Sequence, residues 1–192
     1  MSYIEDSRTN HAILSPSQPA WLNYSEEQLK DAFTKYTAQI RGTRLHELAK
    51  KCIEEGIIPE DSESDLQQKT LHLYVRDCLI FRLRPERRIT YSRNAFGTAD
   101  AIGFRDNHLW IFDLKTGITK ASMRQLWCYS ALFFLSEPYA PADCIIENRI
   151  YQNGEVRIEM PSHEKVSEIM MQIITADKII ESLRKEGYLW TL

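Results

Sequence analysis

GTADAIGFRDNHLWIFDLKTG, residues 97–117, contains two apolar runs separated by the short polar segment RDN. Each run has the length of a β-strand, and a short polar turn between two such runs predicts an antiparallel hairpin. Asp100 lies on the first run, while Asp113 and Lys115 stand at the end of the second. We therefore expect the hairpin to bring both aspartates to one end of a sheet.

Asp113 and Lys115 are two residues apart on a strand, so their side chains share a face, whereas Leu114 points to the other face. Two neighbouring carboxylates repel each other, and a divalent cation relieves this repulsion. Mg²⁺ is commonly held by one or two carboxylates, with water and phosphate oxygens as its other ligands. A lysine beside such an ion can orient a water molecule or stabilise a developing oxyanion, which suits the hydrolysis of a phosphodiester.

A structural interpretation of the same residues stays open. Asp113 and Lys115 alone are compatible with a surface ion pair, and Asp100 with a turn residue. Thr116-Gly117 is equally typical of an ordinary turn that ends a strand.

The segments before the hairpin predict an arm and three helices. Residues 1–24 are expected to be irregular, with Trp21 and Leu22 packed on the body of the protein. Ser25 and Gln28 form a capping-box pattern that begins a helix, and Gly42 is expected to break it. Apolar residues at helical spacing then predict a second helix over 43–56 and a third over 64–83.

The segments after the third helix predict a mixture of strands and helices. Pro85 marks the change, and Asn153-Gly154 is a strong hairpin signal. Strands are expected at 87–92, 97–104, 108–114, 143–151 and 155–160, and helices at 120–135 and 162–187. This order predicts an α/β or α+β fold in which helices flank a central mixed sheet.

The length of 192 residues fits a single domain, 1–192. Its parts would be an N-terminal arm (1–24), a helical part (25–84), a part holding the sheet and one helix (85–160) and a closing helix (161–192). No apolar run is long enough for a membrane-spanning helix, and no signal peptide is evident, so a cytoplasmic protein without a membrane partner is expected. The four cysteines form no CxxC pair and are expected to be reduced and mostly buried.

The formal net charge of −3 argues against binding nucleic acid by overall charge. However, residues 76–93 contain six arginines against only two acidic residues. This run is either a solvated helix end followed by an edge strand or a patch that faces phosphates.

Four pairs of residues together resemble the PD-(D/E)XK nuclease superfamily, in its RecB-like and lambda-exonuclease-like branch. The pairs, in chain order, are Gly42 and His46, Gly97 and Asp100, Asp113 and Lys115, and Gln125 and Tyr129. The segments HAILSPSQPAWLN (11–23) and RIYQNGEV (149–156) are also similar to phage-encoded RecB-like nucleases. The resemblance implies a restriction-endonuclease-like core.

The implied activity is that of a DNA nuclease dependent on Mg²⁺ or Mn²⁺, used as an exonuclease in phage or prokaryotic recombination or repair. A structure-specific endonuclease remains open, as does a nuclease-like fold that binds DNA or protein without cutting. DNA is the implied partner, and a homo-oligomer or a recombination partner protein is left open. The cysteine spacing does not match the iron–sulfur clusters of some relatives, so no cluster is expected.

The resemblance assigns roles to particular residues. His46, Asp100, Asp113 and the backbone carbonyl of Leu114 would bind the metal, and Lys115 would assist catalysis with the two aspartates. Glu86 is an additional candidate for holding metal or water, the alternative being an ion pair with Arg87 or Arg88.

Gln125 and Tyr129 stand on one helix face and would support the site or contact DNA. Arg87, Arg88, Lys120 and Arg124 are further candidates for binding phosphates. For His11, His72, His108 and His163 we expect surface or packing roles.

Overall fold

The computed structural model describes residues 12–117 and 119–186. The helices are η1 (Pro19–Asn23), α1 (Glu26–Glu55), α2 (Leu66–Ile80), α3 (Arg124–Ser136), η2 (Pro141–Asp143) and α4 (His163–Lys185). The strands are β1 (Arg84–Thr90), β2 (Phe96–Arg105), β3 (His108–Leu114), β4 (Ile145–Gln152) and β5 (Glu155–Glu159). The expectation of a mixed sheet flanked by helices is confirmed.

The five strands form one sheet in the order β1-β2-β3-β4-β5. The pairs β1–β2, β2–β3 and β4–β5 are antiparallel, whereas β3 and β4 are parallel and are connected through α3. Both predicted hairpins are present. Asp106-Asn107 and Asn153-Gly154 form their turns with positive φ at both residues, as two-residue hairpin turns require.

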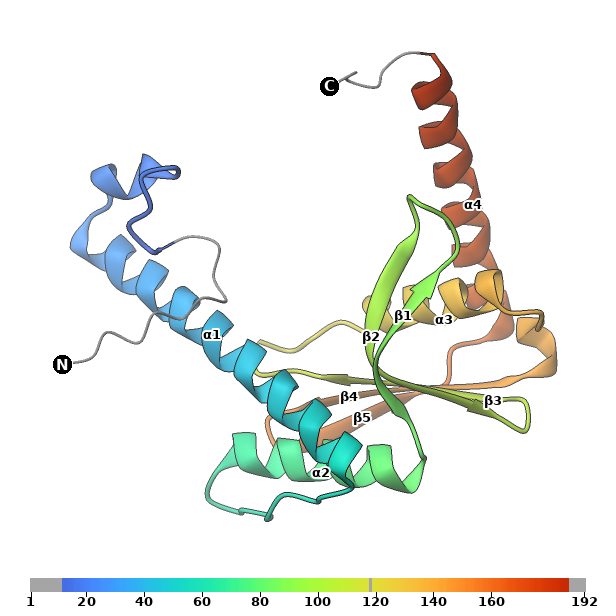
Figure 1. Ribbon diagram of the computed structural model, residues 1–192, viewed down its shortest axis with the longest axis horizontal. Coiled ribbons are helices and arrows are strands. Elements are labelled where there is room, and N and C mark those ends of the chain that lie inside the picture. Colours follow the sequence, from blue (N-terminus) through green and yellow to red (C-terminus); the bar gives the residue numbers. More distant parts are fainter. Residues whose placement is uncertain (1–11, 118, 187–192) are drawn as a thin grey trace.

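Helices cover both faces of the sheet (Figure 1). One core is built by α1, α2 and one face of the central strands, with Phe112 and Leu114 fully buried. The other is built by α3, α4 and the opposite face, with Ile111 and Leu126 at its centre. Because β3 is buried on both sides, the end of this strand is a largely dry setting for a charged residue.

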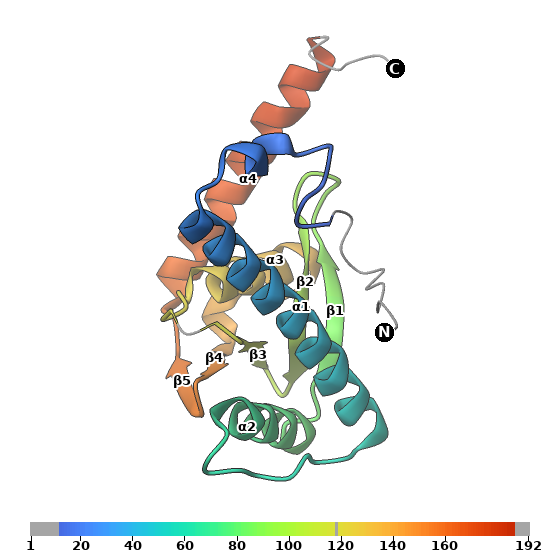
Figure 2. The same ribbon diagram turned by 90° about the vertical axis from the view of Figure 1, so that its left-hand side faces the viewer.

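The expected break at Gly42 is wrong, because α1 is one continuous helix of 30 residues. An interior glycine costs about 1 kcal/mol relative to alanine, but it does not prevent helix formation. The capping box of Ser25 and Gln28 is confirmed, and Gly56 ends the helix in the left-handed conformation. The N-terminal half of α1 and the C-terminal half of α4 both extend beyond the sheet (Figures 1 and 2).

In the arm before α1, the side chain of Leu22 is not buried. Leu22 is 68% exposed, so the expectation that it packs on the body is wrong. Trp21 is half-buried and donates its indole hydrogen bond to the carbonyl of Ser15, within the arm itself. The first eleven residues of the predicted arm, including His11, lie outside the described residues.

The four cysteines are free thiols, as expected, but only Cys78 and Cys144 are buried. Cys52 is half-buried and Cys128 is exposed. In the part of the chain that the structure describes, no helix combines the length and the apolar character needed to cross a membrane.

Candidate active site

The hairpin of β2 and β3 brings Asp100 to the end of β3, as the sequence predicted. The last pair of the ladder is Ala101 with Phe112, so Asp100 and Asp113 occupy the next facing positions. At this point a side-chain carboxylate, that of Asp100, takes the place of a backbone carbonyl as hydrogen-bond acceptor between the two strands. Its Oδ2 accepts a hydrogen bond from the backbone N–H of Leu114 over 3.0 Å.

Asp113 is an almost fully buried carboxylate, with a side chain that is 3% exposed. Lys115 Nζ lies 3.0 Å from both of its oxygens and donates to Oδ1. Oδ2 accepts no hydrogen bond from the described residues, but the Lys115 ammonium lies within ion-pair distance of it. Burial and the neighbouring charge of Asp100 raise the pKa of Asp113 to about 7, although Lys115 opposes this shift.

Gln125, in the first turn of α3, holds the lysine from the other side. Its Oε1 accepts a hydrogen bond from Lys115 Nζ over 2.9 Å. Gln125 is exposed, and its partner is the candidate catalytic lysine, in line with the site-supporting role expected for it.

Tyr129 is one helical turn further along α3 and explains a glycine of the motif series. Its hydroxyl donates to the carbonyl of Thr98 over 2.5 Å. A Cβ atom on Gly97 would lie only 2.8 Å from Cε1 of the tyrosine ring. Gly97 therefore allows α3 to approach β2 closely, next to Asp100.

Gly42 has a similar place on α1. A Cβ atom there would lie 3.1 Å from Oγ1 of Thr116, so the helix passes close to the segment that follows β3. One turn later, Nδ1 of His46 lies 3.5 Å from Oδ2 of Asp100. His46 thus points toward Asp100.

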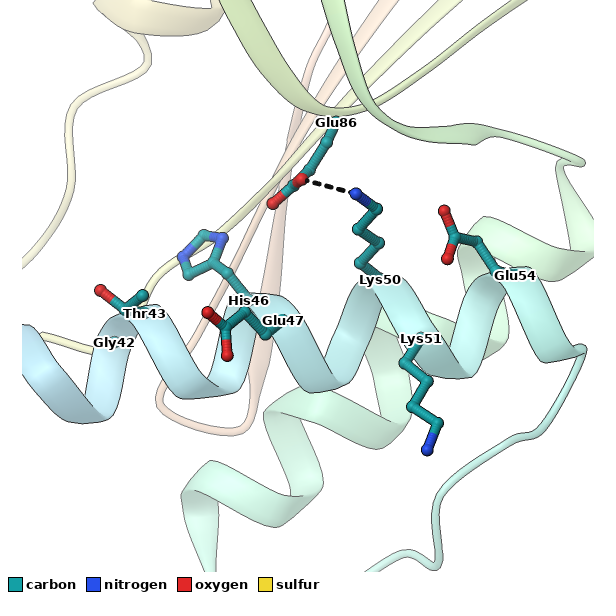
Figure 3. Close-up of a pocket in the computed structure, with 8 residues that line it drawn as sticks. All are labelled: Gly42, Thr43, His46, Glu47, Lys50, Lys51, Glu54 and Glu86. Carbon is teal, nitrogen blue, oxygen red and sulfur yellow. Dashed lines mark hydrogen bonds and ion pairs between the residues drawn. The ribbon is translucent and has the colours of Figure 1, made fainter. Parts of the chain in front are cut away.

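Glu86 joins this site from the edge strand β1. A hollow of about 770 Å³ between α1 and β1 is lined by Gly42, Thr43, His46, Glu47, Lys50, Lys51, Glu54 and Glu86. Figure 3 shows Glu86 above α1, with His46 and Lys50 extending toward it. Glu86 pairs with Lys50 over 3.2 Å, so the alternative of an ion pair with Arg87 or Arg88 is wrong.

Lys50 is a residue that the sequence analysis missed. It stands four positions after His46 on α1, a spacing that places the two on one helix face, and this was the available signal. It neutralises Glu86 in the hollow that His46 also lines. Any cation that recruits Glu86 must therefore compete with the ammonium group of Lys50.

The candidate phosphate-binding residues do not lie together. Arg87 pairs with Glu137 over 3.1 Å, while the exposed Arg88 places its guanidinium 4.1 Å from the centre of the Phe96 ring. Arg124 is exposed immediately before Gln125. Lys120 lines a separate hollow at the β4–β5 turn.

The remaining described histidines have local structural contacts, as expected. A ring nitrogen of His72 lies 2.8 Å from the carbonyl oxygen of Pro59. His163 lies 3.0 Å from the carbonyl oxygen of Cys144. His108 stacks on Trp110 with ring centres 4.0 Å apart.

The carboxylate oxygens of Asp100 and Asp113 are suitable ligands for a hard divalent cation whose other ligands are mostly water molecules. Among residues 12–117 and 119–186, no three His, Cys, Asp or Glu side chains are grouped as ligands of one metal. However, Mg²⁺ needs only one or two carboxylates from the protein. The buried carboxylate of Asp113, at the position that faces Asp100 across the two strands, meets that requirement.

No protein-family model, curated protein or solved structure matches this chain significantly.

Proposed function

We propose that this protein is a metal-dependent DNA nuclease with a PD-(D/E)XK core, which hydrolyses phosphodiester bonds. The observation that carries the proposal is the connected group of Asp100, Asp113, Lys115 and Gln125 at the end of β3. Asp113 is buried beside a second carboxylate, Asp100, and placing two such charges together is costly for a fold, a cost that a bound cation would offset. The resemblance of the motif series supports the same conclusion.

Asp100 and Asp113 would hold Mg²⁺ or Mn²⁺, with His46 and the carbonyl of Leu114 as further ligands. The bound cation would lower the pKa of a water molecule and offset the negative charge of the phosphodiester. Glu86 is available on the open side of the site once it leaves Lys50.

Lys115 would orient the attacking water and stabilise the charge that develops on phosphate oxygens. Its two partners, Asp113 and Gln125, fix its ammonium group at the mouth of the site. Tyr129 would keep α3 against β2, so that Gln125 stays within reach of the lysine.

We assign the enzyme to exonucleases of phage or prokaryotic recombination or repair, on the resemblance to RecB-like and lambda-exonuclease-like proteins. An endonuclease acting on structured DNA uses the same core. A nuclease-like fold that binds DNA or a protein partner without cutting is the second candidate.

Cleavage assays with end-labelled linear DNA and closed circular DNA, with and without Mg²⁺, separate these functions. Metal-dependent loss of the linear DNA alone indicates an exonuclease, and loss of both substrates indicates an endonuclease. If neither is cut in Mg²⁺ or Mn²⁺ while DNA is still bound, the protein is a binding module and the enzymatic proposal is wrong.

A further inference from the structure

A second hollow, outside the candidate active site, has four arginines among its lining residues. Its volume is about 320 Å³. The lining residues are Arg82, Arg84, Arg87, Ile102, Gly103, Phe104, Arg105, Phe133, Glu137 and Tyr139. Four arginines against one glutamate give this arginine groove a formal charge of +3, in a chain whose net charge is −3.

Two of the four arginines are available for a ligand. Arg87 is paired with Glu137, and Arg105 lies over the ring of Trp110. Arg82 and Arg84 are exposed, and neither has an ion-pair partner among the described residues. An exposed, unpaired guanidinium is well suited to bind a phosphate group in a bidentate manner.

An aromatic ring borders the same groove. Tyr139 packs on Phe104 with ring centres 4.4 Å apart, and its ring is nearly parallel to that of Phe133. Although it is held by these two contacts, Tyr139 remains 43% exposed. Arginines beside an exposed aromatic ring are the combination that binds single-stranded nucleic acid, because the arginines contact phosphates while a base stacks on the ring.

The edge of the sheet connects the groove with the candidate active site. β1 is an edge strand, and β2 is its only strand neighbour within the described part of the chain. Glu86 lines the hollow beside His46, and the next residue, Arg87, lines the arginine groove. Successive side chains of a strand point to opposite faces, so the two hollows lie on either side of this edge strand, and an extended ligand reaches both by passing around the edge.

We propose that the arginine groove binds single-stranded nucleic acid, with backbone phosphates on Arg82 and Arg84 and a base on Tyr139. Duplex nucleic acid does not fit this description, because its bases are stacked on one another and offer no free face to the tyrosine. The binding requires no metal ion and no cleavage. It therefore goes beyond the proposed nuclease activity and can be tested separately from it.

Fluorescence anisotropy of a labelled oligo-dT at several salt concentrations, in EDTA, measures this binding without cleavage. The double variant Arg82→Gln/Arg84→Gln should bind about tenfold more weakly. Its slope of log affinity against log salt should fall by about 1.4, because each phosphate contact on a single strand contributes about 0.7. Lys178→Gln/Lys185→Gln on α4 makes the same change in net charge away from the groove and is the matched control.

Tyr139 tests the role of the base. Tyr139→Ala should weaken oligo-dT binding about tenfold without changing the salt slope, while Tyr139→Phe should bind like the wild type. Inorganic polyphosphate has no bases, so it should bind with equal affinity to the wild type, Tyr139→Ala and Tyr139→Phe. Thermal melting of each variant verifies that it is folded.

Three results would overturn the proposal. The first is an arginine double variant that binds like its control. The second is Tyr139→Ala with wild-type affinity, which leaves a phosphate site with no preference for single strands. The third is displacement of oligo-dT by a polyglutamate peptide at equal charge concentration, which indicates a site for acidic protein segments. Failure of DNA cleavage in Mg²⁺ affects none of these measurements.

Discussion

Gln125 Oε1 accepts a hydrogen bond from Nζ of Lys115 over 2.9 Å, and this bond joins the first turn of α3 to the end of β3. The same ammonium group donates to Asp113 over 3.0 Å. A flexible lysine side chain is thus held from two sides, by a strand residue and by a helix residue. Such fixation keeps a charged group aligned with a reacting phosphate.

Removing this bond should reduce turnover while substrate binding changes little. Gln125→Ala is expected to lower kcat by about 10- to 100-fold, a range typical for residues that orient a catalytic group or ligand. The KM for DNA should stay within a few fold. Steady-state kinetics at saturating Mg²⁺ measure both quantities.

Gln67→Ala, at an exposed glutamine on α2, provides the comparison for Gln125→Ala. A variant at Gln125 with unchanged kcat and a raised KM would mean that the glutamine contacts DNA and does not position Lys115.

Asp113→Asn should abolish cleavage without unfolding the protein. The amide keeps the shape of the side chain but removes a negatively charged metal ligand, so the rate should fall at least about 100-fold. Asp106→Asn, in the exposed β2–β3 turn, is the matched control and should cleave normally. Wild-type cleavage by Asp113→Asn would contradict the assignment of the site.

The affinity for Mn²⁺ should depend on pH through Asp113. Because its pKa is raised to about 7, a proton competes with the cation below that pH. We expect the affinity to fall about tenfold per pH unit below pH 7 and to level off above pH 8. Calorimetry across this range tests the expectation, and a flat profile between pH 5 and 8 would contradict it.

The same group should make the metal-free protein less stable as the pH rises. Its pKa in the folded state lies above the ordinary value, so the folded state retains a proton that the unfolded state has lost. This stabilisation is complete below about pH 4 and disappears as the pH rises through 7. Urea titrations at each pH give the free energy of unfolding of the wild type and of Asp113→Asn. The difference between the two values separates the contribution of Asp113 from that of the other titrating groups.

Gly97→Ala should destabilise the fold by about 1–3 kcal/mol, because the new methyl group would overlap the ring of Tyr129. Gly117→Ala meets no atom within 4 Å and serves as the control. In a Tyr129→Ala background the cost at Gly97 should largely vanish, and a double-mutant cycle by chemical denaturation measures this coupling. Additive effects would show that the two residues do not contact each other.

Asp77 should matter for stability and not for catalysis. Its buried carboxylate accepts hydrogen bonds from Arg149 over 3.0 Å and from the hydroxyl of Tyr151 over 2.9 Å. Asp77→Ala leaves the guanidinium of Arg149 without this partner, and we expect a loss of about 3–5 kcal/mol. Asp61→Ala, at an exposed position, should lose less than about 0.5 kcal/mol. Equal urea midpoints for the two variants would refute this role.

Much of the fold followed from the sequence because its signals are local. Turn residues at Asp106-Asn107 and Asn153-Gly154 determine two hairpins, and alternating or helical apolar patterns determine the neighbouring elements. The closeness of Asp100 to the end of β3 also followed, since a short hairpin leaves little freedom in register.

The tertiary structure alone decided which distant residues meet. The local sequence predicts a helix break at Gly42, but Gly42 lies inside α1, where the helix passes Thr116. The pairing of Glu86 with Lys50, and of Arg87 with Glu137, depends on how α1 and α3 pack around β1. The sequence therefore determined the elements and the series of chemical groups, because turns and periodicity act over a few residues. Packing decided the partners of those groups, because contacts between distant segments form only when whole helices and strands are placed together.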